Sequence, residues 1–140
     1  MCMTMKLHFD VSGDDFTRAG EASGKVKSKL KQLGIAPDAV RRVAIALYEG
    51  EINLVIHAGG GEIDVEISAD DIKMTLTDEG PGIADVEKAM TEGYSTATEN
   101  IRSLGFGAGM GLPNMKRYTD IMKIDTKIGE GTKIFMQINL

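Results

Sequence analysis

Three polar side chains are spaced along one predicted helix so that they could bind a charged ligand together. Glu49, Asn53 and His57 follow one another at intervals of four residues within the segment 37–58. Residues at i, i+4 and i+8 lie on the same side of an α-helix. A carboxylate there could act as a general base, and an amide oxygen could bind Mg²⁺, which prefers oxygen ligands. A solvent-exposed polar stripe is the alternative explanation of this spacing.

Glu51 lies only two residues after Glu49 and is therefore expected on another face of the same helix. We expect it to lie outside the site, so that its substitution would serve as a neutral comparison.

A second candidate group is the loop Asp78-Glu79-Gly80-Pro81-Gly82, which follows a predicted strand. The carboxylate of Asp78 could accept a hydrogen bond from the amino group of a buried base. Gly80 and Gly82 would let the backbone come close to that base, because glycine has no side chain in the way. A tight turn is the alternative, since Gly-Pro-Gly also suits a turn.

The strongest local feature is a run of alternating glycines before a predicted helix, Gly105-Phe106-Gly107-Ala108-Gly109-Met110-Gly111-Leu112. Free backbone N–H groups and the helix dipole attract phosphate in such a geometry. The run is not a Rossmann fingerprint, because no strand precedes it, and it lacks the Gly-Lys-Ser/Thr end of a P-loop. A flexible linker is the alternative. A last motif, Gly129-Glu130-Gly131-Thr132, predicts a hairpin turn from which Thr132 could reach a ligand.

The elements that must position these residues follow from periodicity and from turn residues. Strands are expected at 6–11, 62–67, 72–77, 121–127 and 132–139, and helices at 14–33, 37–58, 85–92 and 110–118. The segment 93–107 is polar and irregular. This order predicts the α+β class, a mostly antiparallel sheet with helices packed on one face.

Composition limits the kinds of protein that the chain can be. It has 140 residues, a net charge of −5 and a single cysteine, Cys2. We therefore expect one domain over residues 1–140, without an internal disulfide. Neither a basic block nor an apolar run of membrane-spanning length is present in the sequence, so we expect no nucleic-acid partner, no membrane partner and a cytoplasmic location.

The order of the motifs is more specific than any one of them. Glu-x-x-x-Asn on a helix is followed by Asp-x-Gly-x-Gly, by Gly-x-Gly-x-Gly and by Gly-Thr in the closing hairpin. Over residues 40–140 this order resembles the GHKL ATPases, the superfamily of gyrase, MutL, the heat-shock chaperone and histidine kinases. Within it, the chain is most similar to anti-sigma-factor serine kinases and stress-response switch kinases. The resemblance implies a two-layer α/β sandwich of the Bergerat type, with ATP bound under a mobile lid at 93–107.

The resemblance also implies a role for each motif. Asn53 would bind Mg²⁺, and Glu49 would be the general base for an incoming hydroxyl. Asp78 would bind the adenine amino group, with Thr132 on the same side of the base. The other residues expected to bind the nucleotide are Gly80, Gly82, Gly107, Gly109, Met110, Gly111 and Leu112. Arg102 could approach the γ-phosphate, although no motif fixes that role.

The function implied by the resemblance is an ATP- and Mg²⁺-dependent serine/threonine protein kinase that acts as a switch on a small regulatory protein. A sigma factor or its antagonist would be such a partner, and a homodimer is a further implication. One alternative is a non-catalytic ATP-binding module that sequesters its partner. The other is the catalytic domain of a histidine kinase, although that class generally has Asn at the position of Glu49.

Overall fold

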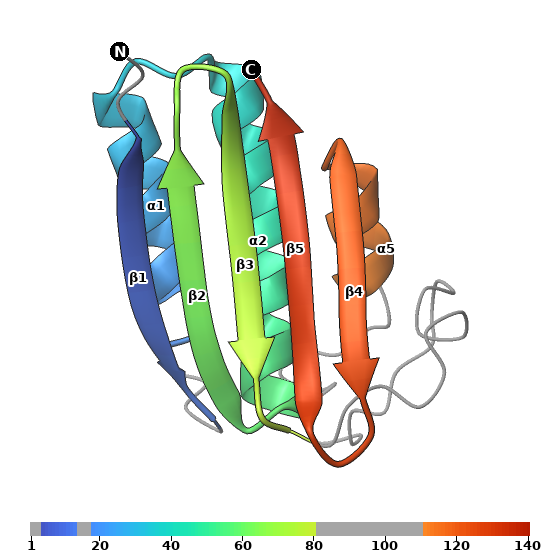
Figure 1. Ribbon diagram of the computed structural model, residues 1–140. Helices are drawn as coiled ribbons and strands as arrows, with labels where there is room; N and C mark the ends of the chain where they lie inside the picture. Colours follow the sequence, from blue (N-terminus) through green and yellow to red (C-terminus); the bar gives the residue numbers. More distant parts are fainter. Residues whose placement is uncertain (1–3, 14–17, 81–110) are drawn as a thin grey trace.

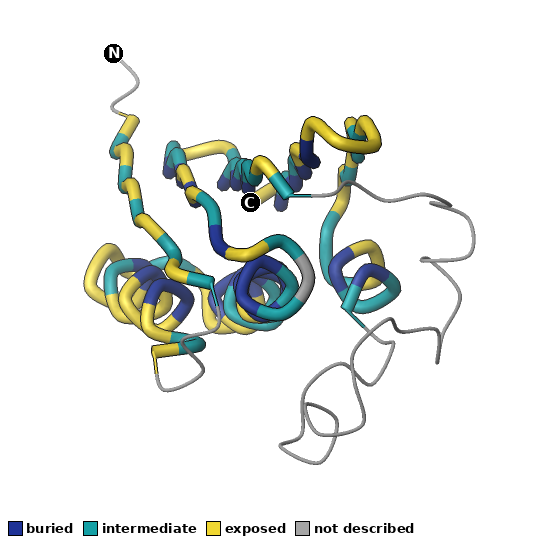
Figure 2. Tube along the Cα trace, turned by 90° about the horizontal axis from the view of Figure 1, so that it is seen from below, coloured by how far each residue is buried: buried dark blue, intermediate teal, exposed yellow. Residues whose placement is uncertain are grey.

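The computed structural model describes residues 4–13, 18–80 and 111–140, which form one sheet with helices on one of its faces (Figures 1 and 2). Viewed from below, α1, α2 and α5 lie in a row beneath the sheet, so the arrangement has two layers (Figure 2). In chain order the elements are β1 (Met5–Ser12), α1 (Glu21–Gln32), α2 (Pro37–His57), β2 (Gly60–Ile67), β3 (Asp71–Asp78), α5 (Gly111–Arg117), β4 (Ile121–Lys127) and β5 (Gly131–Asn139).

The strands have the order β1-β2-β3-β5-β4, and each neighbouring pair is antiparallel. The two hairpins expected from the sequence, β2–β3 and β4–β5, are both present. The register pairs Asp78 at the end of β3 with Thr132 at the start of β5. Pairing of β3 with β5 therefore brings together two predicted site residues that are far apart in the sequence.

The core lies between the sheet and the helices, as the strict alternation of the strands predicts. Ile63, Met74 and Met136 point from three neighbouring strands into this layer and are fully buried. The helix α2 approaches the sheet closely at Gly50, where a Cβ would come within 2.4 Å of a methyl group of Leu76. A larger residue at this position would force the side chain of Leu76 to shift.

The first helix begins later than the sequence predicted. We expected it to start at Asp14, but α1 begins at Glu21, and Gly20 before it has a φ of 94°. That left-handed conformation cannot continue a right-handed helix, so the helix starts after the glycine. Residues 14–17 lie outside the described part of the chain.

Glu51 caps α1 from a neighbouring helix. Its carboxylate accepts hydrogen bonds from the backbone N–H groups of Ala22 (3.1 Å) and Ser23 (3.0 Å), and only 2% of the residue is exposed. No side chain at the N-cap position of α1 supplies such a bond. Glu51 does lie on a different face from Glu49, but because it is buried and bonded its substitution would also change stability, so it does not serve as the comparison that we expected.

Several predictions concern residues outside the described ranges. These are the short helix at 85–92, the lid at 93–107, Arg102 and the nucleotide contacts of Gly82, Gly107, Gly109 and Met110. Among the described residues, none of the helices has the length and apolar character required to cross a membrane.

Candidate functional site

Glu49 and Asn53 lie on the face of α2 that meets the start of α5. A Cβ placed on Gly111 would be 3.7 Å from Oδ1 of Asn53 and 3.8 Å from Oε2 of Glu49. Both side chains are half-buried. Two oxygens from successive turns of α2 therefore face the same glycine, which ends the glycine-rich segment. Of the three residues in the predicted polar stripe, the side chain of His57 lies outside the description.

A hydrogen bond links α5 directly to the predicted base. The side-chain amide of Asn114 donates from Nδ2 to Oε1 of Glu49 at 3.2 Å. Sequence reasoning gave Asn114 no role. The only available signal was its position three residues after Gly111, which places both residues on one side of the helix.

A second group of residues lies where β3 ends. Oδ1 of Asp78 accepts hydrogen bonds from the backbone N–H groups of Gly80 (2.9 Å) and Thr132 (3.2 Å). Thr132 is buried, and its hydroxyl lies 2.8 Å from that of Thr126. Both backbone bonds use Oδ1, so Oδ2 is the oxygen of Asp78 that could accept a hydrogen bond from a ligand. An amino group such as that of adenine would suit this acceptor.

The Asp78 loop lies beside the same helix, α2, that carries Glu49 and Asn53. A Cβ on Gly80 would be 2.8 Å from the carbonyl oxygen of Ala58, so the loop after β3 touches the end of α2. Asn53 precedes Ala58 by five residues, which corresponds to about 7.5 Å along a helix axis. The Asp78 loop and the pair Glu49–Asn53 are therefore arranged along α2, one after the other.

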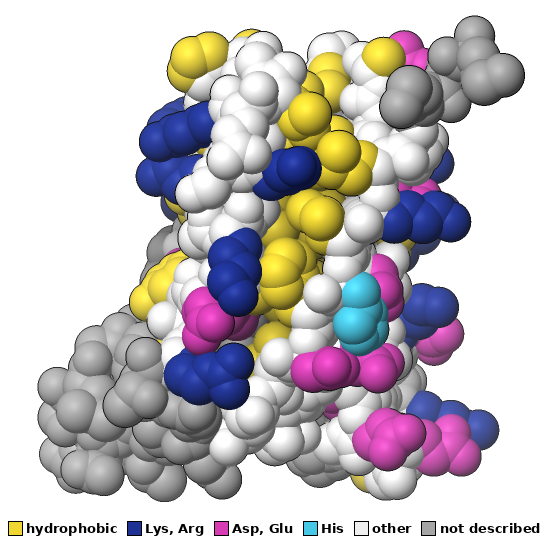
Figure 3. Space-filling model, turned by 90° about the vertical axis from the view of Figure 1, so that its left-hand side faces the viewer, with side chains coloured by type: hydrophobic (Ala, Val, Ile, Leu, Met, Phe, Trp, Pro, Cys, Tyr) yellow, Lys and Arg dark blue, Asp and Glu magenta, His cyan; other side chains and the backbone are white. Residues whose placement is uncertain are grey.

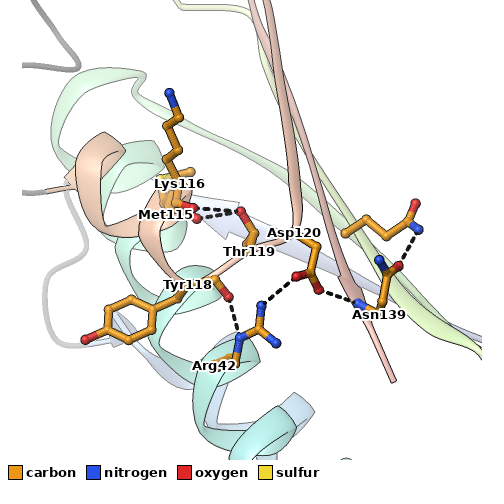
Figure 4. Close-up of polar contacts among 8 residues, drawn as sticks. Arg42, Met115, Lys116, Tyr118, Thr119, Asp120 and Asn139 are labelled. Carbon is orange, nitrogen blue, oxygen red and sulfur yellow. Dashed lines mark hydrogen bonds and ion pairs between the residues drawn. The ribbon is translucent and has the colours of Figure 1, made fainter.

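The far end of α5 is tied to α2 by Arg42 (Figure 4). Its Nε donates to the carbonyl oxygen of Tyr118 at 3.1 Å, and its guanidinium forms an ion pair with Asp120 at 3.2 Å. The backbone N–H of Asn139 also donates to Asp120, and this bond, helped by Arg42, holds the pKa of that carboxyl below its usual range. α5 is thus attached to α2 through Asn114 near its middle and through Arg42 just beyond its C-terminal end.

The donor set fits the ligands that the motifs predict. Mg²⁺ is commonly held by one or two protein oxygens together with phosphate oxygens, and Asn53 offers an amide oxygen beside Gly111. Leu112 has its side chain in the hydrophobic core, so only its backbone could face a nucleotide.

Comparison with known proteins gives first the fold and then the family. The solved structure of the mycobacterial sensor histidine kinase MprB is similar to this chain, with a TM-score of 0.55 and 16% identity over 96% of this chain and 97% of that chain. A family model described as histidine kinase-, DNA gyrase B- and HSP90-like ATPase matches residues 38–140. The chain therefore belongs to this ATPase family.

Two curated relatives indicate which class of protein within this family the chain is similar to. The serine/threonine-protein kinase RsbT of Bacillus subtilis (strain 168) is 36% identical over 77% of this chain and 78% of its own length. An anti-sigma F factor of Clostridium beijerinckii is 30% identical over 80% of this chain and 79% of its own length. These findings confirm the expected GHKL fold, and they bear out the expected class, the serine/threonine kinases and anti-sigma factors of this ATPase family.

Proposed function

We propose that this protein transfers the γ-phosphoryl group of ATP to a serine or threonine hydroxyl of a small regulatory protein, with Mg²⁺ as the metal ion. A sigma factor or its antagonist is the kind of partner that we propose, and the cytoplasm is the proposed location. The observation that supports the reaction most directly is the convergence of Glu49 and Asn53 on Gly111. A histidine kinase would need no carboxylate at Glu49, so this alternative has less support.

The proposed chemistry assigns one task to each side chain. Glu49 accepts the proton of the attacking hydroxyl while the oxygen of that hydroxyl bonds to the γ-phosphorus. The bond from that phosphorus to the bridging oxygen breaks, and ADP leaves with the electron pair. Asn53 holds the metal ion, which when bound neutralises charge on the phosphates. Asp78, with Thr132 beside it, holds the adenine and takes no part in the transfer.

The experiment that tests this function separates nucleotide binding from phosphoryl transfer. Purified protein, Mg²⁺ and labelled ATP are incubated with candidate regulatory proteins, and the wild type is compared with Glu49→Gln. Loss of a general base lowers the rate by about 10²- to 10⁴-fold. ATP affinity, measured by calorimetry, should stay within a few-fold, because Glu49 is not assigned to ATP binding.

The control is Glu66→Gln. Glu66 lies on β2 and forms an ion pair with Lys6 at 3.7 Å between two exposed side chains, so its loss should change neither quantity. Normal transfer by Glu49→Gln would contradict the proposed mechanism. If the wild type binds ATP and a partner but phosphorylates nothing, the sequestering module replaces the kinase as the proposed function.

We also propose a homodimer formed through β1. This strand is at one edge of the sheet and carries four apolar side chains that are only partly buried, Met5, Leu7, Phe9 and Val11. Figure 3 shows an apolar strip on this side of the molecule. A cavity of about 290 Å³ opens between β1 and α1. An edge strand with a free apolar strip favours the addition of another strand.

The charges on β1 favour a second copy as the occupant. In an antiparallel pair of β1 strands centred on His8, Lys6 of each copy lies opposite Asp10 of the other. Opposite charges placed across two antiparallel strands attract each other. The same register would place the two His8 side chains opposite each other. Hydrogen bonds with Asp64, and then with Asp10, raise the pKa of His8 above its ordinary value, so protonation of both His8 side chains would oppose this attraction.

A further inference from the structure

The hydrogen bond between Asn114 and Glu49 joins the two helices of the candidate site. An ionised carboxylate can only accept hydrogen bonds, so the amide of Asn114 must present its NH₂ group to it. Nδ2 of Asn114 lies 3.2 Å from Oε1 of Glu49, and both side chains are half-buried. This bond therefore fixes one of the two carboxylate oxygens in space.

The two oxygens of Glu49 have different surroundings. Oε1 is occupied by Asn114, whereas Oε2 lies 3.8 Å from the point where a Cβ on Gly111 would be. Oδ1 of Asn53 is 3.7 Å from the same point. We infer that Asn114 is a positioning residue that orients Glu49, so that Oε2 is the oxygen that receives the proton of the attacking hydroxyl. This inference rests on the proposed role of Glu49 as the base.

The position of Asn114 is itself fixed by the attachment of α5. Met115, the next residue, is fully buried under the helix. Beyond the end of α5, Arg42 holds the carbonyl of Tyr118, as Figure 4 shows. Arg42 and Glu49 are seven residues apart, so both lie on the face of α2 that meets α5. A side chain on a helix that is anchored in this way can hold a catalytic group in one orientation.

In the proposed reaction this orientation matters for the proton transfer and not for ATP binding. The O–H bond of the substrate breaks, and its proton moves to Oε2, while the new O–P bond forms and the bond to the ADP oxygen breaks. A carboxylate without Asn114 would still be a base, but it could rotate away from the hydroxyl. The expected defect is therefore in kcat, with the KM for ATP little changed.

The test compares Asn114→Leu, which has a similar volume and no donor, with the wild type. Loss of a hydrogen bond to a charged group corresponds to about a 10- to 100-fold lower kcat, and the KM for ATP should change less than about threefold. Asn114→Gln, which keeps an amide donor, should recover part of the rate. Lys116→Ala, on the exposed side of α5, is the control and should behave as the wild type. Two readouts are used, phosphorylation of the partner protein and hydrolysis of ATP with Mg²⁺ alone, where water replaces the hydroxyl.

A double-mutant cycle distinguishes positioning from a general structural role. If Asn114 acts through Glu49, adding Asn114→Leu to Glu49→Gln should lower the rate no further. A structural role would lower it in both backgrounds. If Asn114→Leu does not fold, Asn114→Ala, which removes the donor without adding a charge beside Glu49, replaces it in the cycle.

Each outcome bears on one proposal or on both. If Glu49→Gln is impaired but Asn114→Leu has a normal kcat, the positioning role is overturned and the kinase mechanism stands. Additive losses in the cycle overturn it as well. If Glu49→Gln is as active as the wild type, or the wild type neither transfers phosphate nor hydrolyses ATP, the proposed base is wrong and the role of Asn114 falls with it.

Discussion

At the scale of single residues, the carboxylate of Asp78 divides its two oxygens between the protein and the proposed ligand. Oδ1 accepts two backbone N–H groups, and Oδ2 is the oxygen proposed for the adenine. Asp78→Asn can keep its amide oxygen on the backbone and would then place an NH₂ group toward the base. ATP affinity should fall by about 10- to 100-fold, because hydrogen bonds to charged groups contribute about 1.5–3 kcal/mol.

Calorimetry measures this loss, and Asp125→Asn on the exposed part of β4 is the matched control. A folded Asp78→Asn protein with unchanged ATP affinity would contradict the assignment of the adenine to Asp78.

A substitution of Gly111 should lower the affinity for ATP without lowering the stability of the fold. Its φ is not in the left-handed region, and a methyl group there would make only ordinary contacts with Glu49 and Asn53. Gly111→Ala should therefore fold with unchanged or slightly higher thermal stability. If phosphate occupies this space, the methyl overpacks the site. That costs about 1–3 kcal/mol, or about a 5- to 150-fold loss of ATP affinity.

The comparison for Gly111→Ala is Gly24→Ala, since a Cβ on Gly24 of α1 would have no atom within 4 Å. Gly24→Ala should leave ATP binding as it is. Full ATP affinity in Gly111→Ala would mean that the phosphates do not approach this glycine.

The sequence predicted which site residues lie together on one element, but it did not predict contacts between residues of two different elements. The pair Glu49 and Asn53 follows from the helical repeat alone, which is a local rule. Asn114 was missed because its partner is 65 residues away and on another helix. The capping role of Glu51 was missed for the same reason, since its partners are the backbone N–H groups of α1. Only packing brings such groups together.

At the scale of elements, α1 depends on a cap supplied by α2. Removing the carboxylate in Glu51→Ala leaves the N–H groups of Ala22 and Ser23 buried without an acceptor. We expect the free energy of unfolding to fall by about 2–4 kcal/mol. Denaturant unfolding measures the loss, and hydrogen exchange should be fastest in α1.

The control for the cap is Glu21→Ala. Glu21 forms ion pairs with Arg18 and Lys25 on the exposed side of α1, and such pairs contribute at most about 1 kcal/mol. Equal stability of Glu51→Ala and the wild type would show that water replaces the cap.

The predicted boundaries of helices and strands agree with the observed ones where they depend on a local sequence pattern. Period-2 alternation located β2 to β5 to within two residues of their observed ends, because each inward side chain of these strands meets the core. Pro37 correctly marked the start of α2. The start of α1 was wrong because the left-handed conformation of Gly20 ends the regular helix geometry there, and the sequence alone gives no φ angle.

At the scale of the whole molecule, the candidate site and the proposed dimer interface lie on different sides of the two-layer arrangement. Toward β5 and β4, α2 and α5 carry the residues proposed for ATP and for transfer. Toward β1, the sheet ends in a free edge beside an apolar strip (Figure 3). A partner strand on β1 would leave the contact between α2 and α5 uncovered, so dimer formation and phosphoryl transfer can be tested independently.

The charges on β1 allow the proposed dimer to be tested without changing its apolar side chains. Lys6→Glu would place two negative charges opposite each other at two symmetric positions, so the dissociation constant of the dimer should rise by about 5- to 30-fold. Asp10→Lys should weaken it similarly, because two positive charges would then meet. The double variant, Lys6→Glu with Asp10→Lys, exchanges the charges and should restore most of the affinity, which a nonspecific surface effect would not do.

Sedimentation velocity over a range of concentrations measures the dissociation constant of each variant. Lys123→Glu reverses an exposed charge on β4, the opposite edge of the sheet, and should leave association unchanged. Restoration in the double variant depends on the register centred on His8, because only there does Lys6 face Asp10. A wild type that stays monomeric at every concentration contradicts the dimer. Dimers whose dissociation constant does not depend on the charges of β1 contradict the register centred on His8.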